Sequence, residues 1–309
     1  MKNWNGQPYY PISAYFKNRF GEKIYKISVG ISESCPNRKS NDPSKICIFC
    51  DELGSAGSHI QTDLALSQQI ANGREQLKKR FRVKKFLVYF QPYTNTFARL
   101  STLQNSIETA LAETDVCGAI LGTRPDCLPS KLFPILKSFN EQKYISVELG
   151  AQSLYDDDLE FLHRGHTVQQ TLDAIEKLHT EAGVEVGLHL MFGLPNETDE
   201  RIKKTAKKIN SLPIHNVKLH NLHVLKDTEL ERLYQEGTFE PIDLEPYADR
   251  VGLFLQHLSA DIAVQRLAAV APRHDELIAP IWTKERMRPS QVIIKRMKDR
   301  QIVQGMSAL

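Results

Sequence analysis

The chain has 309 residues, of which 41% are hydrophobic and 25% charged, and its 40 basic and 37 acidic side chains leave a net charge of +3. This is the composition of an ordinary globular protein, and a nearly neutral charge neither requires nor excludes a nucleic-acid partner. No apolar run approaches the length of a membrane span, and residues 1–8 lack the apolar core of a signal peptide, so we expect a cytoplasmic protein without a membrane partner.

Strand-like segments recur along the chain, and several are continuous apolar runs rather than alternating ones. Residues 86–90, for example, read Phe-Leu-Val-Tyr-Phe, which is typical of a strand buried on both faces of a parallel sheet. The expected strands are residues 23–29, 85–90, 116–121, 144–149, 184–191 and 216–222.

Helical segments are expected between these strands, at residues 62–81, 101–112, 129–140, 168–181 and 197–211. The first begins at Thr62, carries an apolar stripe and ends in basic residues, which suits the helix dipole. Asn196 is the expected N-cap of the last helix, and Gly183 is the expected stop after residues 168–181.

The β-α alternation repeats about six times between residues 23 and 236. Such repeats form either a doubly wound sheet or a barrel, and six units would make an incomplete barrel that is open on one side. We therefore predict an α/β fold, a partial (β/α)6 TIM-like barrel. The expected domains are an N-terminal segment at 1–22, the barrel at 23–240 and a C-terminal extension at 241–309 that packs on the barrel. A separate small domain is the alternative for the extension.

Three of the five cysteines lie close together in the sequence, at Cys35, Cys47 and Cys50. Cys35 follows the first expected strand, and the carboxyl ends of barrel strands are where sites are built. In a reducing compartment such thiols are better interpreted as metal ligands than as disulfides. Thiolates suit zinc and iron–sulfur clusters alike, and His59 is the nearest candidate for a fourth zinc ligand. Three thiolates without a fourth ligand leave one coordination position free.

Further motifs follow the expected strands in order, and Phe49, an aromatic residue, directly precedes the third cysteine. The motifs are residues 89–96, 122–127, 148–153, 164–167, 192–195 and 217–223. With the cysteines, they resemble the radical SAM superfamily, and more closely the YhcC/YtqA-type proteins, which are relatives of the radical SAM domain of the Elongator catalytic subunit. One departure is the loop at residues 36–46, which lacks the glycines that relatives often have there but carries three basic residues.

The resemblance implies that the three cysteines hold a [4Fe–4S] cluster whose fourth iron is chelated by S-adenosylmethionine (SAM). The reduced cluster would cleave SAM to a 5′-deoxyadenosyl radical, which abstracts hydrogen from a substrate. An electron donor such as flavodoxin or ferredoxin would be a partner. The substrate implied by the relatives is a wobble uridine of tRNA, so that the reaction would be a tRNA modification.

The resemblance also implies roles for residues around SAM. The motif of the second expected strand would contact the amino group of the methionine part of SAM. The motif of the fourth expected strand would contact either the ribose or the amino end of SAM. Gly193 and Leu194 would lie beside its adenine. Arg164 is the candidate for the SAM carboxylate, because a guanidinium fork matches that group. The full set expected to bind the cofactor is Phe49, Gln91, Tyr93, Thr94, Glu148, Gln152, Arg164, Gly193 and Leu194.

Each of these assignments has a structural alternative. Glu148 would instead pair with a neighbouring cation, Gln152 would cap the next segment, and Arg164 would be a solvated residue at a helix end. Gly193 and Leu194 also fit a plain strand-to-helix turn.

Cys127 and the basic C-terminal residues are the remaining candidates. Cys127 is a candidate catalytic residue that would donate a hydrogen atom or bind substrate, with plain packing as the alternative. Packing is the expected role of Cys117, and the two histidines of the last motif, His220 and His223, either face the site or fill the core. The basic residues would either contact phosphates or form the solvated face of an amphipathic helix, and they are Arg286, Arg288, Lys295, Arg296, Lys298 and Arg300.

Two other functions are compatible with the residues alone. One is radical chemistry on a small metabolite, and the other is a non-catalytic protein that is stabilised by zinc. The sequence gives neither the substrate nor the electron donor.

Overall fold

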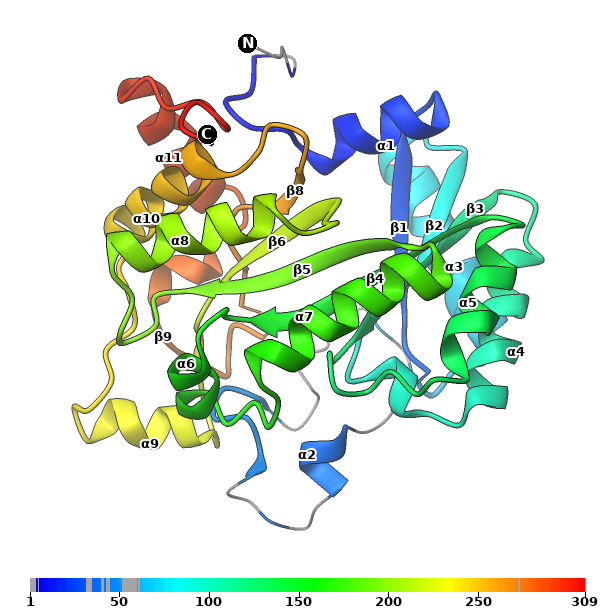
Figure 1. Cartoon of the computed structure of the whole chain (residues 1–309), viewed down its shortest axis with the longest axis horizontal. Helices are drawn as coiled ribbons and strands as arrows, with labels where there is room; N and C mark the ends of the chain where they lie inside the picture. The colour runs from blue at the N-terminus through cyan, green and yellow to red at the C-terminus, as the bar shows by residue number, and fades with distance from the viewer. Residues whose placement is uncertain are drawn as a thin grey trace.

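The computed structural model describes residues 4, 6–31, 35–39, 42, 45–51, 60, 62–271 and 273–308. In these residues a seven-stranded sheet runs in the order β1-β2-β3-β4-β5-β6-β8, and every neighbouring pair is parallel. The sheet curves into a half barrel (Figure 1). Its strands are β1 (Ile24–Val29), β2 (Lys85–Phe90), β3 (Val116–Thr123), β4 (Tyr144–Gln152), β5 (Glu185–Phe192), β6 (Asn216–Asn221) and β8 (Ala263–Arg266).

Helices cover the outer face of the sheet (Figure 1), and the main apolar core lies between the two layers. They are α3 (Leu66–Phe81), α4 (Leu100–Leu111), α5 (Leu132–Asn140), α7 (Val168–Lys177) and α8 (Asp199–Asn210). Every residue of β4 is buried. This agrees with the prediction, made from the continuous apolar runs, that the strands are covered on both faces. The predicted partial barrel is confirmed, and all six expected strands are present.

Several predicted helix boundaries are wrong by a few residues. The helix expected from Thr62 begins at Leu66, and the one expected from residue 129 begins at Leu132. Asn196 is not an N-cap, because the side chain of Thr198 accepts the bond from the backbone N–H of Arg201 at 3.2 Å. The expected stop at Gly183 is confirmed: a π-helix at Leu178–Ala182 ends there in the left-handed conformation.

The seventh strand was not predicted. β8 belongs to the segment that follows residue 240, and it pairs with β6 on the side away from β5. With four residues it is too short for its periodicity to be informative. The same segment contributes α10 (Leu244–His257), which packs on α8, and α11 (Arg288–Asp299), which packs on α10. The division of the chain at residue 240 stays a prediction.

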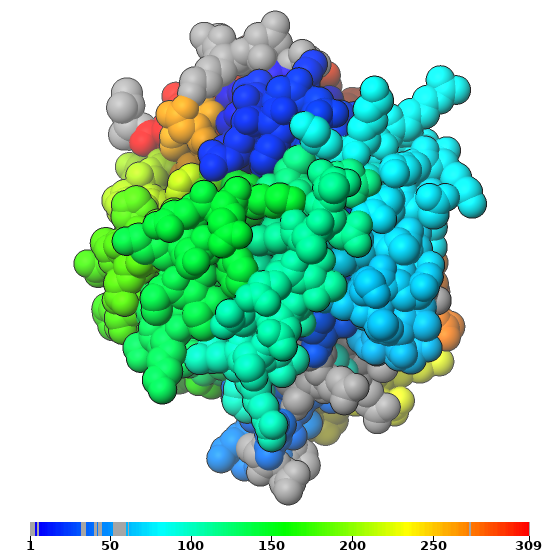
Figure 2. All heavy atoms as spheres, turned by 90° about the vertical axis from the view of Figure 1, so that its right-hand side faces the viewer, coloured from blue at the N-terminus to red at the C-terminus, as the bar shows by residue number. Residues whose placement is uncertain are grey.

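Helix α1 (Ile12–Phe20) was also missed, although it closes one end of the barrel. Phe16 packs there with residues at the start of β1, β2 and β4, including Ile24, Leu87 and Tyr144. In Figure 2 the N-terminal segment, in dark blue, covers this end of the molecule. The helix lacks a side-chain N-cap, since Pro11 precedes it, and has no acidic residue in its first turn, so the usual start signals are missing.

Short elements complete the described part of the chain. They are α2 (Pro36–Lys39), the 3-10 helix η2 (Asn95–Phe97), α6 (Asp156–Phe161), α9 (Glu229–Gln235), the antiparallel pair of β7 (Val224–Leu225) and β9 (Leu277–Ala279), and the 3-10 helix η4 (Ile281–Lys284). In Figure 1, α2 and α1 lie at opposite ends of the molecule. No helix in the described ranges is both long and apolar enough to cross a membrane.

Candidate functional site

The cysteines lie at the carboxyl end of the strands, where backbone contacts fix the turn that carries two of them. The backbone N–H of Cys50 donates to the carbonyl of Cys47 at 2.9 Å, which closes the turn. Between them, Ile48 is 1% exposed and packs in an apolar cluster with Leu162 and Leu194. The Ile48 N–H donates to the Leu162 carbonyl at 3.3 Å. Ile48 is therefore the anchor that attaches the cysteine turn to the barrel.

Nitrogen donors surround the sulfur atoms of this turn. Arg164 Nη1 lies 3.2 Å from Cys47 Sγ, and Asn37 Nδ2 lies 3.4 Å from the same sulfur. Arg38 Nη2 lies 3.6 Å from Cys50 Sγ and also bonds the backbone carbonyls of Cys50 and Asp51. Such N–H donors and positive charges favour a thiolate over a thiol.

Burial acts in the opposite direction on the thiol of Cys50. It raises the pKa of the Cys50 thiol to about 11, and the neighbouring Cys47 adds to the rise, whereas Arg38 lowers it. A bound metal centre reverses this balance, because a coordinating thiol is deprotonated by the charge of the metal.

The donor set fits an iron–sulfur cluster. Within the ranges that the structure describes, no three His, Cys, Asp or Glu side chains converge as ligands of one metal ion. A cubane cluster does not need such convergence, because each cysteine binds a different iron atom. Three thiols, two of which have N–H donors beside them, are the kind of ligand set that binds such a cluster. His59, the candidate fourth ligand for zinc, lies outside the described residues.

A second layer of side chains orients Asn37. Arg124, which is 4% exposed, donates from Nη1 to Asn37 Oδ1 at 2.5 Å, which leaves the amide nitrogen directed at Cys47. Asp126 holds Arg124 through two bonds of 2.9 and 2.8 Å. Burial by itself would raise the pKa of Asp126, but the bond with Arg124 brings it below its usual value. The sequence motif at residues 122–127 contained Arg124 and Asp126, yet their role was not predicted.

Cys127 lies beside this layer and is 9% exposed. Its Sγ is 3.8 Å from Asp126 Oδ1. Burial raises the pKa of the Cys127 thiol to about 12, and Asp126 adds to the rise, so the group is a neutral thiol at pH 7. The catalytic role of Cys127 stays a prediction.

The loop after β2 is held by a residue that sequence reasoning missed. Asn95 Nδ2 donates to the carbonyls of Phe90 at 2.8 Å and Gly122 at 2.9 Å, and this amide ties the ends of β2 and β3 together. The loop that Asn95 holds contains three of the predicted site residues, at the carboxyl end of β2. Gln91 directly follows the strand, Tyr93 has a φ of +56°, and Thr94 is 2% exposed. A buried Asn in a turn of aromatic and hydroxyl residues was the available signal.

Glu148 was predicted to lie at the end of the fourth strand. In the structure it lies in the middle of β4. Its carboxylate is 1% exposed and accepts bonds from Lys26 at 2.7 Å and from His189 Nε2 at 2.7 Å. The structural alternative, a pair with a neighbouring cation, is therefore what the structure shows. Side chains on a strand alternate between the two faces, and Glu148 points into the barrel below the strand end. A contact of Glu148 with SAM stays a prediction.

Gln152 is the last residue of β4, as expected, and Arg164 lies between α6 and α7; both are 8% exposed. Gln152 has a φ of +66°, and its buried Oε1 has no hydrogen-bond partner within the described structure, as expected for an atom that a ligand would satisfy. Arg164 is not a solvated residue: besides Cys47, it contacts the carbonyl of Gly150 at 3.1 Å and lies 6.0 Å from the centre of the Phe49 ring. A contact with the SAM carboxylate stays a prediction.

The turn after β5 is tied to α8 and α10. Gly193 has a φ of +90°, and its N–H donates to Glu197 Oε2 at 2.9 Å, which in turn accepts a bond of 2.6 Å from Arg250. A Cβ at Gly193 would lie 2.6 Å from a methyl group of Ile242, so the position requires glycine for space as well as for conformation. Leu194 is 3% exposed and packs in the cluster of Ile48. A contact of Gly193 or Leu194 with adenine stays a prediction, and Glu197 was missed.

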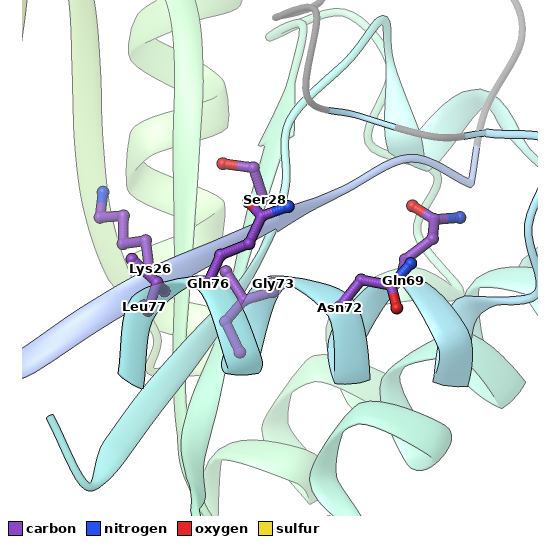
Figure 3. A pocket seen from close by; sticks show the side chains of 8 residues that line it. Lys26, Ser28, Gln69, Asn72, Gly73, Gln76 and Leu77 are labelled. Atoms are coloured by element: carbon purple, nitrogen blue, oxygen red, sulfur yellow. The ribbon is translucent and has the colours of Figure 1, made fainter. Parts of the chain in front are cut away.

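A separate pocket of about 130 Å³ opens at the free edge of the sheet, between β1 and α3 (Figure 3). It contains none of the predicted site residues. Gln69 closes part of this edge, because its amide pairs with both the N–H of Gly30 at 2.9 Å and the C=O of Gly30 at 3.1 Å. Lys26, which bonds Glu148 inside the barrel, also lines the pocket.

A half barrel of parallel strands with three thiols at its carboxyl edge defines the class of protein. The profile of the Radical SAM superfamily matches residues 31–209, and that of the Radical_SAM C-terminal domain matches residues 214–299. The chain belongs to the radical SAM superfamily and is a radical SAM enzyme whose substrate is unassigned.

Within the superfamily the chain is of the YhcC/YtqA type. It is 36% identical to the uncharacterized protein MJ0486 of Methanocaldococcus jannaschii, over 94% of this chain and 89% of that one. It is 30% identical to the protein YhcC of Escherichia coli K12, over 87% and 85% of the two chains. It is 29% identical to the uncharacterized protein YtqA of Bacillus subtilis, over 96% and 92%.

Two matches concern longer proteins. The fold is similar to that of the Methanocaldococcus infernus Elp3, with a TM-score of 0.69 and 18% identity over 91% of this chain. This chain covers 64% of that structure, slightly less than two thirds of its length. A tRNA uridine(34) acetyltransferase of M. jannaschii is 37% identical over 123 residues, which are 38% of this chain and 22% of that protein.

Proposed function

We propose that this enzyme modifies a uridine of tRNA by radical chemistry. The observation that carries the proposal is the 37% identity with a tRNA uridine(34) acetyltransferase over 38% of the chain. That relative's name describes a modification at a defined tRNA uridine. The acetyltransferase reaction itself is not proposed here, because this chain covers only 22% of that protein.

The family implies two cofactors, and their contacts with this chain are proposals. Cys35, Cys47 and Cys50 would hold a [4Fe–4S] cluster, and SAM would complete it at the iron that no cysteine binds. With a flavodoxin or ferredoxin as electron donor, such a cluster would supply the one electron needed to cleave SAM to methionine and a 5′-deoxyadenosyl radical, which would remove hydrogen from the substrate.

We propose that the chain's own residues would support this chemistry as follows. Arg164 and Asn37 donate N–H groups to Cys47 and so reduce the negative charge on its sulfur. Gln152 presents a buried, unsatisfied oxygen that would accept a bond from SAM. Glu197 fixes the Gly193 backbone close to where adenine is proposed to lie. Cys127 keeps its proton at neutral pH and would serve as a hydrogen-atom donor.

The basic C-terminal helix does not add to the case for RNA. Arg296 and Arg300 both pair with Asp249, and Arg288 pairs with Glu285. Ile293 and Met297 are buried on the other side of the helix. These contacts support the alternative prediction, a solvated amphipathic helix, and the exposed pairs neutralise part of its positive charge. Radical chemistry on a small metabolite is therefore kept as the second candidate.

The test compares tRNA with small molecules directly. Reconstituted enzyme is incubated without oxygen with SAM, a reductant and bulk tRNA, and the digested nucleosides are analysed by mass spectrometry. We expect one uridine derivative to change in mass, and no change with the Cys47→Ala variant. Binding of tRNA should weaken steeply as salt is raised, because phosphates release counterions. Unchanged nucleosides together with absent or salt-independent binding would favour the metabolite.

A further inference from the structure

The interior of the half barrel carries more positive than negative charge. Lys26, Lys218 and Arg266 come from three different strands and point toward the lumen. Within the described residues Glu148 is the one carboxylate there that pairs with Lys26 and Lys218. Buried cations are normally paired, since an unpaired charge inside a protein loses its hydration. Among the residues that the structure describes, the lumen therefore has fewer negative groups than its cations require.

Glu148 already accepts hydrogen bonds from three other side chains in the lumen. It accepts bonds from Lys26 Nζ at 2.7 Å, His189 Nε2 at 2.7 Å and Gln265 Nε2 at 2.9 Å. Lys218 Nζ lies further away, at 3.6 Å, and is bonded to the Tyr89 hydroxyl at 2.8 Å. The single carboxylate is thus mainly committed to Lys26, and it neutralises Lys218 only weakly.

Arg266 is the cation that has no negative partner among the described residues. It forms no ion pair within the described residues, and its contacts there are the carbonyl of Leu219 at 3.4 Å and the ring nitrogens of His220 at 2.7 and 2.8 Å. The His220 ring is stacked on His189 at 5.3 Å between ring centres. These contacts fix the guanidinium in place without neutralising its charge. Arg266 and His220 are both partly exposed.

The electrostatics of the neighbouring groups agree with this geometry. Burial lowers the pKa of Lys218 to about 7, and Arg266 and Lys26 lower it further against the effect of Glu148. Burial and then Arg266 also hold the pKa of His220 well below its usual range, so the imidazole remains neutral. An anion bound at Arg266 would relieve both effects.

We infer that Arg266, supported by Lys218 and His220, binds an oxyanion of the substrate inside the barrel, a carboxylate or a phosphate. A planar guanidinium matches either group with two parallel hydrogen bonds. The site deepens the proposed function, on which its link to a substrate rests, because it names the charge that the substrate carries. It also explains why the lumen holds Arg266 on β8, a strand that lies at the open edge of the half barrel.

The experiment measures anion binding without turnover. Holoenzyme is saturated with SAM, so that any site for the SAM carboxylate is filled, and is titrated with inorganic phosphate or with acetate at constant ionic strength. Binding is followed by calorimetry and by the rise in unfolding temperature. We expect saturable binding of at least one of the two anions. Phosphate alone would identify a phosphate on the substrate, and acetate alone a carboxylate.

The variants are Arg266→Gln, Arg266→Lys and, as the matched control, Arg300→Gln, whose arginine is exposed and pairs with Asp249. Removing the charged donor should weaken binding by about 10- to 100-fold, with a smaller loss for lysine, and the control should bind like the wild type. The wild-type titration does not depend on the folding of any variant.

If neither anion binds the wild type, or if Arg266→Gln binds the anions as well as the wild type does, the inference is overturned. Neither result depends on tRNA, so failure here leaves the proposed function standing, and a negative tRNA assay leaves this site standing.

Discussion

Arg164 Nη1 donates a hydrogen bond to the Sγ of Cys47 across 3.2 Å, and the same guanidinium contacts the Gly150 carbonyl at 3.1 Å. This contact joins the end of β4 to the cysteine turn. It also places a permanent positive charge beside a sulfur that would bind the cluster. Because hydrogen bonds to the sulfurs of an iron–sulfur cluster tune its reduction potential, Arg164 should determine how easily the cluster accepts an electron.

Replacing Arg164 by methionine should make the cluster harder to reduce. The loss of one charge-assisted bond of about 1 kcal/mol corresponds to a shift of about 40 mV to lower potential for a one-electron couple. The potential is measured by redox titration monitored by electron paramagnetic resonance. Arg201→Met is a suitable control. This arginine pairs with the half-exposed Asp157, and none of its contacts within the described residues is with a cysteine. An unchanged potential in Arg164→Met would show that the bond to Cys47 has no electrostatic role.

Truncating Ile48 should release the cysteine turn. Ile48→Ala removes a side chain that is 1% exposed in the apolar cluster beside the turn, and we expect a loss of about 2–4 kcal/mol in the free energy of unfolding. Iron bound per chain after the same reconstitution should fall as well. Ile202→Ala is the matched control, because Ile202 is 2% exposed in the main core, outside the apolar cluster that contains Ile48. If both variants retain equal iron, the anchoring role of Ile48 is wrong.

Alanine at Gly193 should weaken SAM binding. The new Cβ would lie 2.6 Å from Ile242, and the φ of +90° disfavours any side chain, so the turn must shift. We expect a loss of about 1–3 kcal/mol in stability and a clear rise in the Kd for SAM. Gly183→Ala is the control: it has a φ of +63° with open space around its Cβ, and it lies at the far end of β5. Equal SAM affinity in both variants would remove the turn from the cofactor site.

Acid should destabilise the protein through its buried neutral histidines. Burial lowers the pKa of His223 to about 4, and that of His189 to about 4 as well. Because an unfolded histidine titrates near pH 6.5, the folded state binds fewer protons between pH 6.5 and 4. The stability is fully present above pH 6.5 and is lost as the pH falls toward 4, by at most about 3 kcal/mol for each histidine.

The measurement is urea unfolding as a function of pH. His223→Gln keeps a hydrogen-bonding side chain beside Asn221 but cannot take up a proton, so its stability should fall less steeply over this range than that of the wild type. Identical slopes for the two proteins would contradict the assignment of His223 as a buried neutral group.

The sequence predicted the barrel well because its strands are buried on both faces and are long enough to be recognised. β2 was predicted at its observed bounds, Lys85–Phe90. β8 and α1 were missed for the opposite reason: one is four residues long and the other has no start signal, and both form only because the barrel offers them a surface. Neither element can be recognised from local periodicity.

The residues of the candidate site also fall into two groups, those that a local sequence pattern predicted and those that it did not. The cysteine spacing and the order of the motifs predicted Cys35, Cys47 and Cys50 as one set of ligands, and the structure places Arg164 against Cys47 and near Phe49. Asn37 and Arg124 were not predicted, because their contact joins residues 87 positions apart in the sequence. Long-range contacts of this kind leave no local pattern.

The position of Glu148 could not be predicted for a related reason. Its four polar partners come from β1, β5, β6 and β8, so the network exists only once the barrel has curved. The motif at residues 148–153 was correctly placed on β4, but one strand can direct its residues to both the lumen and the site at the strand end.

The central claim is that Cys35, Cys47 and Cys50 hold a [4Fe–4S] cluster, and metal and sulfide analysis of protein prepared without oxygen tests it most directly. We predict about four iron atoms and four sulfides per chain, and reduction in the presence of SAM should yield 5′-deoxyadenosine. The Cys47→Ala variant should lose both. Zinc without sulfide at these thiols, or full iron content in Cys47→Ala, would contradict the account.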